Sequence, residues 1–330
     1  MYLLFIEKGL SILKMSGHLC FINPIRFFNS DYGLGCRKII IRENKLKSVL
    51  DVSQLPVFQN AMTYPCVLII QHENNKNSDN SIIYKRLSNL SSLTDVDNIY
   101  GLVIPQNEIS TDPENKIIVD ADPKMKNIVK KIDIKSDKIE NLFFIARGLA
   151  NNKVDFEGAK YKALKSTNVR RYFIEGELKR IDTDYSDIFS SEMIILPRTV
   201  AFLQAMLKGK KIVCLDRIYY LTPKTPCNLK FVLGVINSKL INQWFEYYYN
   251  TTKVSGNYFD LNGLQIGSIP IPVATSDEQE KISNLVDKIL ADKSKNNAFD
   301  TSETERKIEK ILYKLYDLDS EEINTMENMK

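Results

Sequence analysis

The sequence predicts an α/β fold that supplies the closing part of a sheet, followed by an α+β domain and a C-terminal helical hairpin. Helix-type and strand-type patterns alternate up to residue 72, which is typical of a sheet with helical connections. Short strand patterns then surround one long apolar helix, and the end of the chain carries the helical period twice. We place the domain boundaries at 1–72, 73–133, 134–276 and 277–330.

The first expected element is a helix over residues 2–15. No capping residue and no targeting segment precede it, and Gly17 is a fitting end for it. Its apolar residues recur at helical spacing: Leu3, Ile6, Leu10 and Leu13. We therefore expect the sheet to which this helix belongs to begin outside these 330 residues.

Strand, helix, strand and strand patterns follow, as in the closing half of an α/β sheet. They cover residues 18–22, 32–42, 46–52 and 66–70. In such sheets a Gly-rich turn after the first strand binds nucleotide-type cofactors. None of the thirteen glycines forms a GxGxxG or GxxxxGK(S/T) loop, and the close pair Gly33 and Gly35 precedes a helix. The sequence therefore predicts no cofactor loop in this chain.

The middle of the chain is expected to hold short strands and one long helix. Residues 73–133 form a connector with strand patterns at 82–86, 100–104 and 116–119. Further strand patterns lie at 142–145, 193–196, 211–214 and 219–221. The helix is predicted over 230–249, because its apolar residues fall three or four positions apart on one stripe.

The C-terminal segment predicts a helical hairpin. The spacings Ser276-x-x-Gln279 and Ser302-x-x-Glu305 are typical of capping boxes, and each precedes an apolar helical stripe. Both helices are acidic on the polar face, which disfavours nucleic-acid contact there.

The composition predicts a soluble protein of the cytoplasm. Of its residues 44% are hydrophobic and 26% charged, and no apolar run approaches the roughly 20 residues of a membrane span. The five cysteines are widely spaced and form no CxxC pair, so we expect reduced thiols and no zinc site.

Splitting the net charge of +4 along the chain locates a basic region. Lys plus Arg against Asp plus Glu is 8 to 4 in 1–72, 8 to 10 in 73–133, 20 to 13 in 134–276 and 9 to 14 in 277–330. A basic segment of this kind favours a polyanionic partner, because lysine and arginine neutralise phosphates. A solvated basic face without a ligand is the alternative.

Most of the predicted DNA contacts lie in two runs without Asp or Glu, residues 158–172 and residues 193–215. The candidates are Lys160, Lys162, Lys165, Arg170, Arg171, Arg198, Lys210 and Lys211. Lys208 lies in the second run as well. The polar loop at 250–259 adds Lys253, Asn257 and Tyr258, with a plain surface loop as the equal alternative.

Histidine, metal and nucleophile chemistry find little support. His18 and His72 lie far apart without a cluster of ligands, and no Ser or Cys lies in a GxSxG elbow. A metal-dependent nuclease could use Asp155 with Glu177-Leu-Lys179. The same Glu-x-Lys spacing recurs at Glu305-Arg-Lys307 inside a helix, so it arises by chance at this composition.

Two long stretches of the N-terminal part read YLLFIEKGLSILKMSGHLCFINPIRFFNSDYGLGCRKIII and VLDVSQLPVFQNAMTYPCVLII. They resemble the late motifs of the catalytic domain in N6-adenine DNA methyltransferases of type II restriction–modification systems. FVLGVINSKLINQWFEYYY and SIPIPVATSDEQEKISNLVDKIL resemble their TaqI-like C-terminal specificity domain, and IEKILYKLYDLDSEEI is similar to their C-terminal tail. The resemblance implies a Rossmann-like methyltransferase sheet followed by a DNA target-recognition domain.

The resemblance also implies what this chain lacks. The family's S-adenosyl-L-methionine (AdoMet) loop and its Asn/Asp-Pro-Pro-Tyr/Phe motif precede the resembled region, and Asn23-Pro24-Ile25-Arg26 differs at its third and fourth positions. We expect no catalytic residue and no cofactor or metal site here, with AdoMet bound in the complete enzyme. Double-stranded DNA and an N-terminal methyltransferase half are the expected partners.

The resemblance gives one residue beside the target base. Phe58 falls where the family places an aromatic on the extruded adenine, although a core position is the alternative. The chain would contribute specificity and be inactive alone. A specificity subunit of a multi-subunit restriction system is the second hypothesis.

Overall fold

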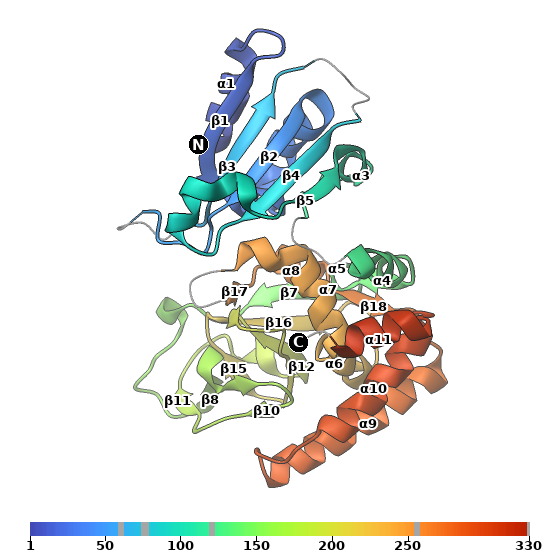
Figure 1. The fold of residues 1–330 in the computed structure, drawn as a ribbon. Coiled ribbons are helices and arrows are strands. Elements are labelled where there is room, and N and C mark those ends of the chain that lie inside the picture. The colour runs from blue at the N-terminus through green and yellow to red at the C-terminus, as the bar shows by residue number, and fades with distance from the viewer. Residues whose placement is uncertain (59–62, 74–78, 119–122, 254–257, 329–330) are drawn as a thin grey trace. The chain divides into compact units, whose positions relative to one another are not determined.

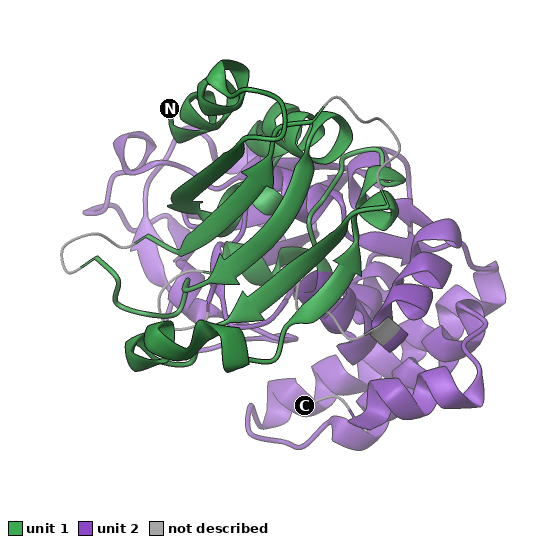
Figure 2. Cartoon of the chain, turned by 45° about the horizontal axis from the view of Figure 1, so that its top comes forward, with its two compact units in different colours: residues 1–121, 248–255 green, residues 122–247, 256–330 purple. Residues whose placement is uncertain are grey.

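A computed structural model describes residues 1–58, 63–73, 79–118, 123–253 and 258–328. The chain forms two compact units, coloured separately in Figure 2. Unit 1 comprises residues 1–121 and 248–255, and unit 2 comprises residues 122–247 and 256–330. The division of the sequence into four segments stays a prediction.

Unit 1 is built on a five-stranded sheet of mixed direction with the order β1-β3-β2-β4-β5 (Figure 1). Strand β3 is antiparallel to both neighbours, so β1 and β2 run parallel to each other. Strand β4 pairs in parallel with β2, and β5 is antiparallel to β4. The strands are β1 (His18–Pro24), β2 (Lys45–Asp51), β3 (Pro65–Gln71), β4 (Ser81–Arg86) and β5 (Leu102–Pro105). All five overlap expected strands, whereas residues 116–118 form none.

Helices pack against one face of this sheet and bury its apolar side chains. They are α1 (Tyr2–Ile12), α2 (Leu34–Lys38) with the π-turn η3 (Ile39–Glu43), and α3 (Gln106–Ser110). Ile6 and Leu10 of α1 are buried with Leu68 and Ile70 of β3 in one core cluster. A 3-10 segment, η4 (Leu90–Asn98), precedes β5.

The returning segment 248–255 completes unit 1. The Asn29 side-chain amide donates a hydrogen bond of 2.7 Å to the Thr251 hydroxyl. The ammonium of Lys116 lies 5.4 Å from the ring centroid of Tyr248 and 5.8 Å from that of Tyr249. Unit 1 therefore takes side chains from two separate stretches of sequence.

Unit 2 contains a four-stranded and a three-stranded sheet. The first has the order β14-β12-β16-β7 and the second β11-β8-β15. These strands are β7 (Phe143–Arg147), β8 (Tyr161–Leu164), β11 (Lys179–Ile181), β12 (Met193–Pro197), β14 (Met206–Lys208), β15 (Ile212–Cys214) and β16 (Ile218–Pro223). Short two-stranded pairings join β9 (Val169–Arg170) to β10 (Phe173–Ile174), β13 (Thr199–Val200) to β17 (Phe259–Asp260), and β6 (Ser136–Lys138) to β18 (Pro270–Pro272).

The single helix expected over 230–249 is two helices, α6 (Leu229–Ile236) and α7 (Lys239–Tyr249). The break is caused by polar side chains at the junction. The Asn237 amide bonds the main chain of Ala205 as donor and acceptor, and the Ser238 hydroxyl accepts from the Ile241 N–H as α7 begins. An apolar stripe alone could not reveal these partners.

The C-terminal segment forms α9 (Ser276–Lys295), α10 (Ser302–Leu315) and a third helix, α11 (Ser320–Asn328). The capping box of α9 uses Thr275 and Glu278, one residue before the expected pair. Gly234 lets α6 approach α9 closely, because a Cβ atom there would lie 2.8 Å from Ile282 Cγ2. The sequence reading also missed α4 (Pro123–Ile134), which it treated as connector. Two short helices, α5 (Ile139–Leu142) and α8 (Gly263–Gly267), complete unit 2.

Candidate nucleic-acid interface

Strand pairing in the three-stranded sheet of unit 2 brings basic side chains together. Lys162 on β8 lies directly opposite Arg180 on β11, and both side chains are exposed. Directly opposed side chains share one face, and like charges in such pairs destabilise a sheet. Lys160 is exposed just before β8 begins, two residues ahead of Lys162. This basic face, defined as Lys160, Lys162 and Arg180, is suited to an anion.

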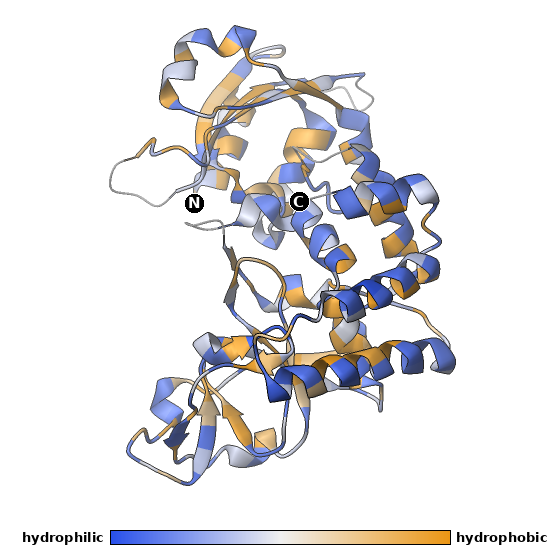
Figure 3. Ribbon diagram, turned by 60° about the horizontal axis from the view of Figure 1, so that its bottom comes forward, coloured by the Kyte–Doolittle hydropathy of each residue, from blue (hydrophilic) through white to orange (hydrophobic). Residues whose placement is uncertain are grey.

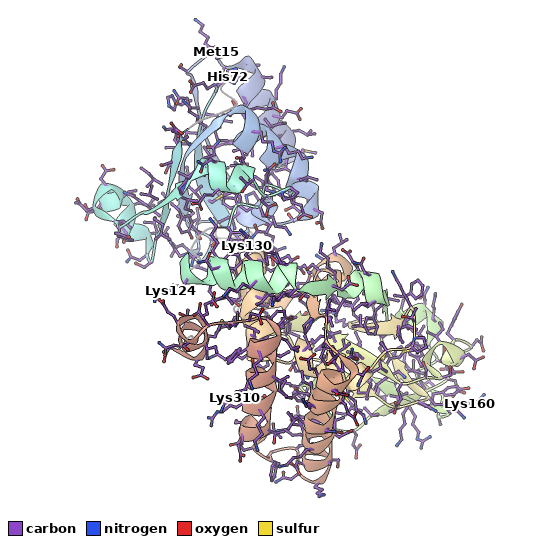
Figure 4. All side chains as sticks on the ribbon, turned by 90° about the vertical axis from the view of Figure 1, so that its right-hand side faces the viewer. Met15, His72, Lys124, Lys130, Lys160 and Lys310 are labelled. Atoms are coloured by element: carbon purple, nitrogen blue, oxygen red, sulfur yellow. The ribbon has the colours of Figure 1, made fainter. Side chains whose placement is uncertain are left out.

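The contact with Tyr161 affects the pKa of Lys160. Its ammonium lies 5.2 Å from the Tyr161 ring centroid, and a hydrogen bond to Tyr161 raises the pKa of the lysine. The pKa of Tyr161 is lowered by its hydrogen bonds with Ser186 and with Lys160. Lys160 therefore stays fully charged at neutral pH. Figure 4 labels it on the strand-rich part of unit 2.

Three other predicted contacts are also exposed. Lys165 follows β8, and Lys210 and Lys211 form the turn that leads into β15. Lys211 has a φ of 60°, in the left-handed region, and its N–H donates to the Phe189 carbonyl.

The predicted arginines differ from these lysines because carboxylates neutralise them. Arg170 lies 2.6 Å from Glu175, and Arg171 lies 2.5 Å from Glu305 on α10. The Arg171 Nε atom is buried without a hydrogen-bond partner. The ion pair with Glu305 holds Arg171 against the acidic helix that the sequence assigned to a separate segment.

Arg198 forms a bidentate pair with Asp260. Its Nε and Nη2 atoms lie 2.9 and 3.0 Å from the two carboxylate oxygens, and this hydrogen bonding raises the pKa of the guanidinium. Arg198 lies between β12 and β13, and the ion pair links it to the last residue of β17. About a third of each side chain remains exposed.

Lys208 is a structural residue, although it lies in the second basic run. It is fully buried, and its ammonium donates to the carbonyls of Phe189, Ser191 and Gly209. Burial lowers its pKa. A charge so enclosed has no surface to offer a phosphate.

The loop candidates and Phe58 have different surroundings. Lys253, in unit 1, is only 8% exposed, whereas Tyr258, in unit 2, is 44% exposed. Asn257 lies outside the described residues. Phe58 is 46% exposed, which is not the environment of a core side chain.

Arg180 and Lys179 are exposed basic residues that are not among the contacts predicted from the sequence. They follow Glu177, which belongs to the Glu-x-Lys pattern of the nuclease hypothesis. Arg180 is exposed on β11, and it is brought opposite Lys162 only by the pairing of β8 with β11.

The structure gives the nuclease reading no support. Among the described residues, no three His, Cys, Asp or Glu side chains lie where they could hold a metal ion. The Asp155 carboxylate accepts from the Glu157 N–H in a turn, and the Asp155 main chain pairs with Asp182.

In the part of the chain that is described, no helix is both long and apolar enough to span a membrane.

Comparison with known families yields two matches. Residues 1–58 match the family model of the Eco57I restriction-modification methylase, and residues 147–271 match that of the TaqI-like C-terminal specificity domain. The second range contains the whole basic face.

Curated relatives are type II restriction enzymes and methyltransferases. The chain is 30% identical over 190 residues to RM.Eco57I of Escherichia coli, covering 54% of this chain and 18% of that protein. It is 26% identical over 270 residues to the putative RM.MjaORFECS2P of Methanocaldococcus jannaschii, covering 73% and 22%. The chain thus spans about a fifth of the length of these relatives.

A solved structure shares the fold. The type IIL restriction-modification enzyme MmeI, determined in complex with DNA, superposes with a TM-score of 0.60 at 11% identity and covers 97% of this chain and 50% of that one. These comparisons agree with the sequence resemblance: the chain is similar to type II restriction enzymes and methyltransferases, and residues 147–271 are similar to the TaqI-like C-terminal specificity domain.

Proposed function

We propose that this chain binds double-stranded DNA as the target-recognition part of an N6-adenine DNA methyltransferase of a type II restriction–modification system. The observation that carries the proposal is the basic face, where the exposed side chains of Lys162 and Arg180 lie opposite each other and Arg180 donates to the main-chain carbonyl of Ala159. A sheet keeps such a pair at a cost that a bound phosphate would offset. The relatives combine restriction enzyme and methyltransferase in one protein, so a separate specificity subunit is not favoured.

Unit 1 would complete the methyltransferase sheet. Its strands β1 and β2 run parallel and are joined through α2 and η3, with β3 reversed between them. A parallel pair with a helical crossover is typical of α/β sheets. Strand β1 is at the edge of the described sheet, where a further strand could add. An N-terminal methyltransferase half is the proposed partner along this edge.

Phe58 would contribute one wall of the pocket for the extruded adenine. Its exposed ring follows β2 in unit 1 and is available for stacking. The exposed lysines Lys165, Lys210 and Lys211 would contact phosphates. Arg171 would instead hold the recognition part to α10 through its ion pair with Glu305.

The residues present do not fit an AdoMet site. Strand β1 is followed by Ile25 in a 3-10 turn, not by a glycine turn, and among the described glycines only Gly176, in unit 2, has a positive φ. A helix-and-glycine cradle for a nucleotide-type cofactor is therefore missing after this strand. AdoMet would bind the partner half in the complete enzyme.

Removing the basic face should weaken DNA binding and flatten its salt dependence. For Lys162→Ala with Arg180→Ala, the slope of log K against log salt should fall in magnitude by roughly 1–2, because each lost phosphate contact removes about 0.9. Fluorescence anisotropy with a mixed-sequence duplex measures this slope. Stability should be unchanged or slightly higher, since the variant also removes a like-charge pair.

The matched control is Arg306→Ala with Lys310→Ala, which removes the same two residue types from the exposed face of α10 (Figure 4). Its slope should equal that of the unmodified chain. Equal slopes for both double variants would show that DNA does not contact the basic face.

Calorimetry with AdoMet tests the assignment of the cofactor to the partner half. No heat of binding is expected for the 330-residue chain up to millimolar cofactor. Micromolar affinity would refute the assignment.

A further inference from the structure

Three arginines gather at one end of the four-stranded sheet of unit 2. The main-chain N–H of Arg198, after β12, donates to the carbonyl of Arg217, which extends the pairing of β12 with β16 by one residue. Arg147, the last residue of β7, lies opposite Tyr219 of β16. Strand β12 itself consists of buried apolar residues, and Figure 3 shows apolar strands in this unit. We name Arg147, Arg198 and Arg217 the arginine cluster.

Two aspartates neutralise the arginine cluster only in part. Arg147 Nη2 lies 2.8 Å from Asp216 Oδ1, and the two side chains are 45% and 43% exposed. An ion pair so exposed contributes little to stability, so it can open to a ligand at small cost. Arg217 is exposed and forms no ion pair with any other described residue. With Asp260 beside Arg198, the cluster holds three cations against two carboxylates.

The Arg198 guanidinium is held in a fixed orientation. Asp260 accepts from Nε and Nη2, which uses two of the five N–H donors of an arginine. This hydrogen bonding is the main cause of the raised pKa of Arg198, and Tyr219 and Asp216 raise it less, so both lie near the guanidinium. Three N–H donors remain on Nη1 and Nη2, and 32% of the side chain is exposed.

The free edge of Arg198 suits a pair of neutral acceptors better than a phosphate. Because Asp260 compensates its charge, the ion pair attracts a phosphate only weakly. Its remaining N–H groups lie on two neighbouring nitrogens, and the O6 and N7 atoms of guanine in the major groove are acceptors for such a pair. Arg217 has no carboxylate beside it, so its uncompensated charge favours a phosphate.

The ribbon of β13 and β17 presents the ion pair of Arg198 and Asp260. Thr199 lies opposite Asp260, and the Leu261 N–H donates to the Arg198 carbonyl at 2.7 Å. These main-chain contacts fix the backbone of both partners. The major groove of DNA admits a two-stranded ribbon, so side chains at its end can reach the edges of bases.

We propose that Arg198, oriented by Asp260, contacts a guanine of the DNA target through O6 and N7, and that Arg217 contacts a nearby phosphate. This inference rests on the proposed function, because it names the residue and the base through which the recognition part distinguishes its target. Asp260 is a positioning residue, since it acts through Arg198. An ion pair that only joins Arg198 to β17 is the alternative.

Guanine analogues test the contact. The probe is a pool of duplexes with a randomised central segment, from which the unmodified chain selects a target. Each guanine of the selected duplex is then replaced in turn by 7-deazaguanine, which lacks the N7 acceptor. One replacement should weaken binding about fivefold, because it removes one of the two hydrogen bonds of a bidentate contact. Fluorescence anisotropy measures these affinities.

Arg198→Lys keeps the charge but loses the planar pair of donors. This variant should bind the natural duplex and that 7-deazaguanine duplex equally, while its other base preferences and its salt slope stay unchanged. Asp260→Asn should reduce the same fivefold difference, because a neutral amide holds the guanidinium less firmly. The control Arg306→Lys, at an exposed position of α10, should retain the difference in full.

Arg217→Ala should give the opposite signature. Its affinity should fall by the same factor for every duplex, and the slope of log K against log salt should fall in magnitude by about 0.9. An unchanged slope would overturn the phosphate contact of Arg217.

The outcomes separate this inference from the proposed function. If every 7-deazaguanine effect persisted in Arg198→Lys, or if that variant lost all base preferences together, Arg198 would not contact a guanine. Duplex binding without base preference, or a selected target without guanine, would overturn the inference while leaving DNA binding intact. If the unmodified chain bound no duplex, the proposed function itself would be wrong.

Discussion

Asp51→Ala should lower the free energy of unfolding of unit 1 by about 3 kcal/mol, because it removes one partner of a buried ion pair. The Asp51 carboxylate is fully buried at the end of β2. It accepts from the Tyr84 hydroxyl at 2.6 Å, from Arg86 Nε at 2.9 Å and from the Ser53 N–H at 2.8 Å. Alanine would remove the carboxylate acceptor from all three donors. About a third of the Arg86 side chain is exposed, which places the effect at the lower end of the usual range.

Hydrogen exchange of the β2 and β4 amides measures this loss, since the single tryptophan lies in unit 2. Asp51→Asn should cost less, because an amide oxygen still accepts from Tyr84 or Ser53. The exposed Asp31 provides the control, and Asp31→Ala should leave the exchange unchanged. If the β2 and β4 amides of Asp51→Ala exchanged as slowly as those of the unmodified chain, the hydrogen bonds of Asp51 would not hold β2 to β4.

Glu309→Ala should destabilise unit 2 by about 2 kcal/mol, because it leaves buried donors unpaired. The buried Glu309 carboxylate on α10 accepts from the main-chain N–H groups of Lys239 at 2.5 Å and Leu240 at 3.2 Å, where α7 begins. Urea unfolding followed by the fluorescence of Trp244, itself buried in α7, reports the change.

The pH dependence of Glu309 has a definite sign. Burial raises the pKa of Glu309 above its usual 4.5. The folded state then holds this proton more tightly than the unfolded state, so the contribution of Glu309 to stability falls as pH rises from 4.5 through the raised pKa. Glu309→Gln removes this dependence, and its stability relative to the unmodified chain should increase as the pH rises above 4.5. A difference independent of pH would contradict the raised pKa.

The strands of unit 1 could be predicted because each apolar run has the length and composition of a buried strand. The predicted ranges 18–22, 46–52 and 66–70 all lie within or overlap β1, β2 and β3. The order of those strands could not be predicted, since periodicity within a strand carries no information about its neighbours.

The candidate site was less accessible to sequence reasoning than the fold. Lys162 and Arg171 were predicted alike as contacts from the count of basic residues, although Lys162 is exposed and Arg171 pairs with Glu305. Lys208 lies in the second basic run, but it is enclosed by carbonyls. These differences arise from contacts between residues distant in sequence. Arg180 was missed because its position opposite Lys162 appears only once β8 and β11 are paired.

The returning segment of unit 1 has a consequence for biosynthesis. Thr251 and Tyr249, which contact Asn29 and Lys116, leave the ribosome only after residues 122–247 have been made. At 5–20 residues per second, that interval is roughly 6–25 s. Unit 1 therefore cannot be completed until most of unit 2 has been synthesised. All five strands of its sheet emerge before the segment that makes the last contacts of the unit.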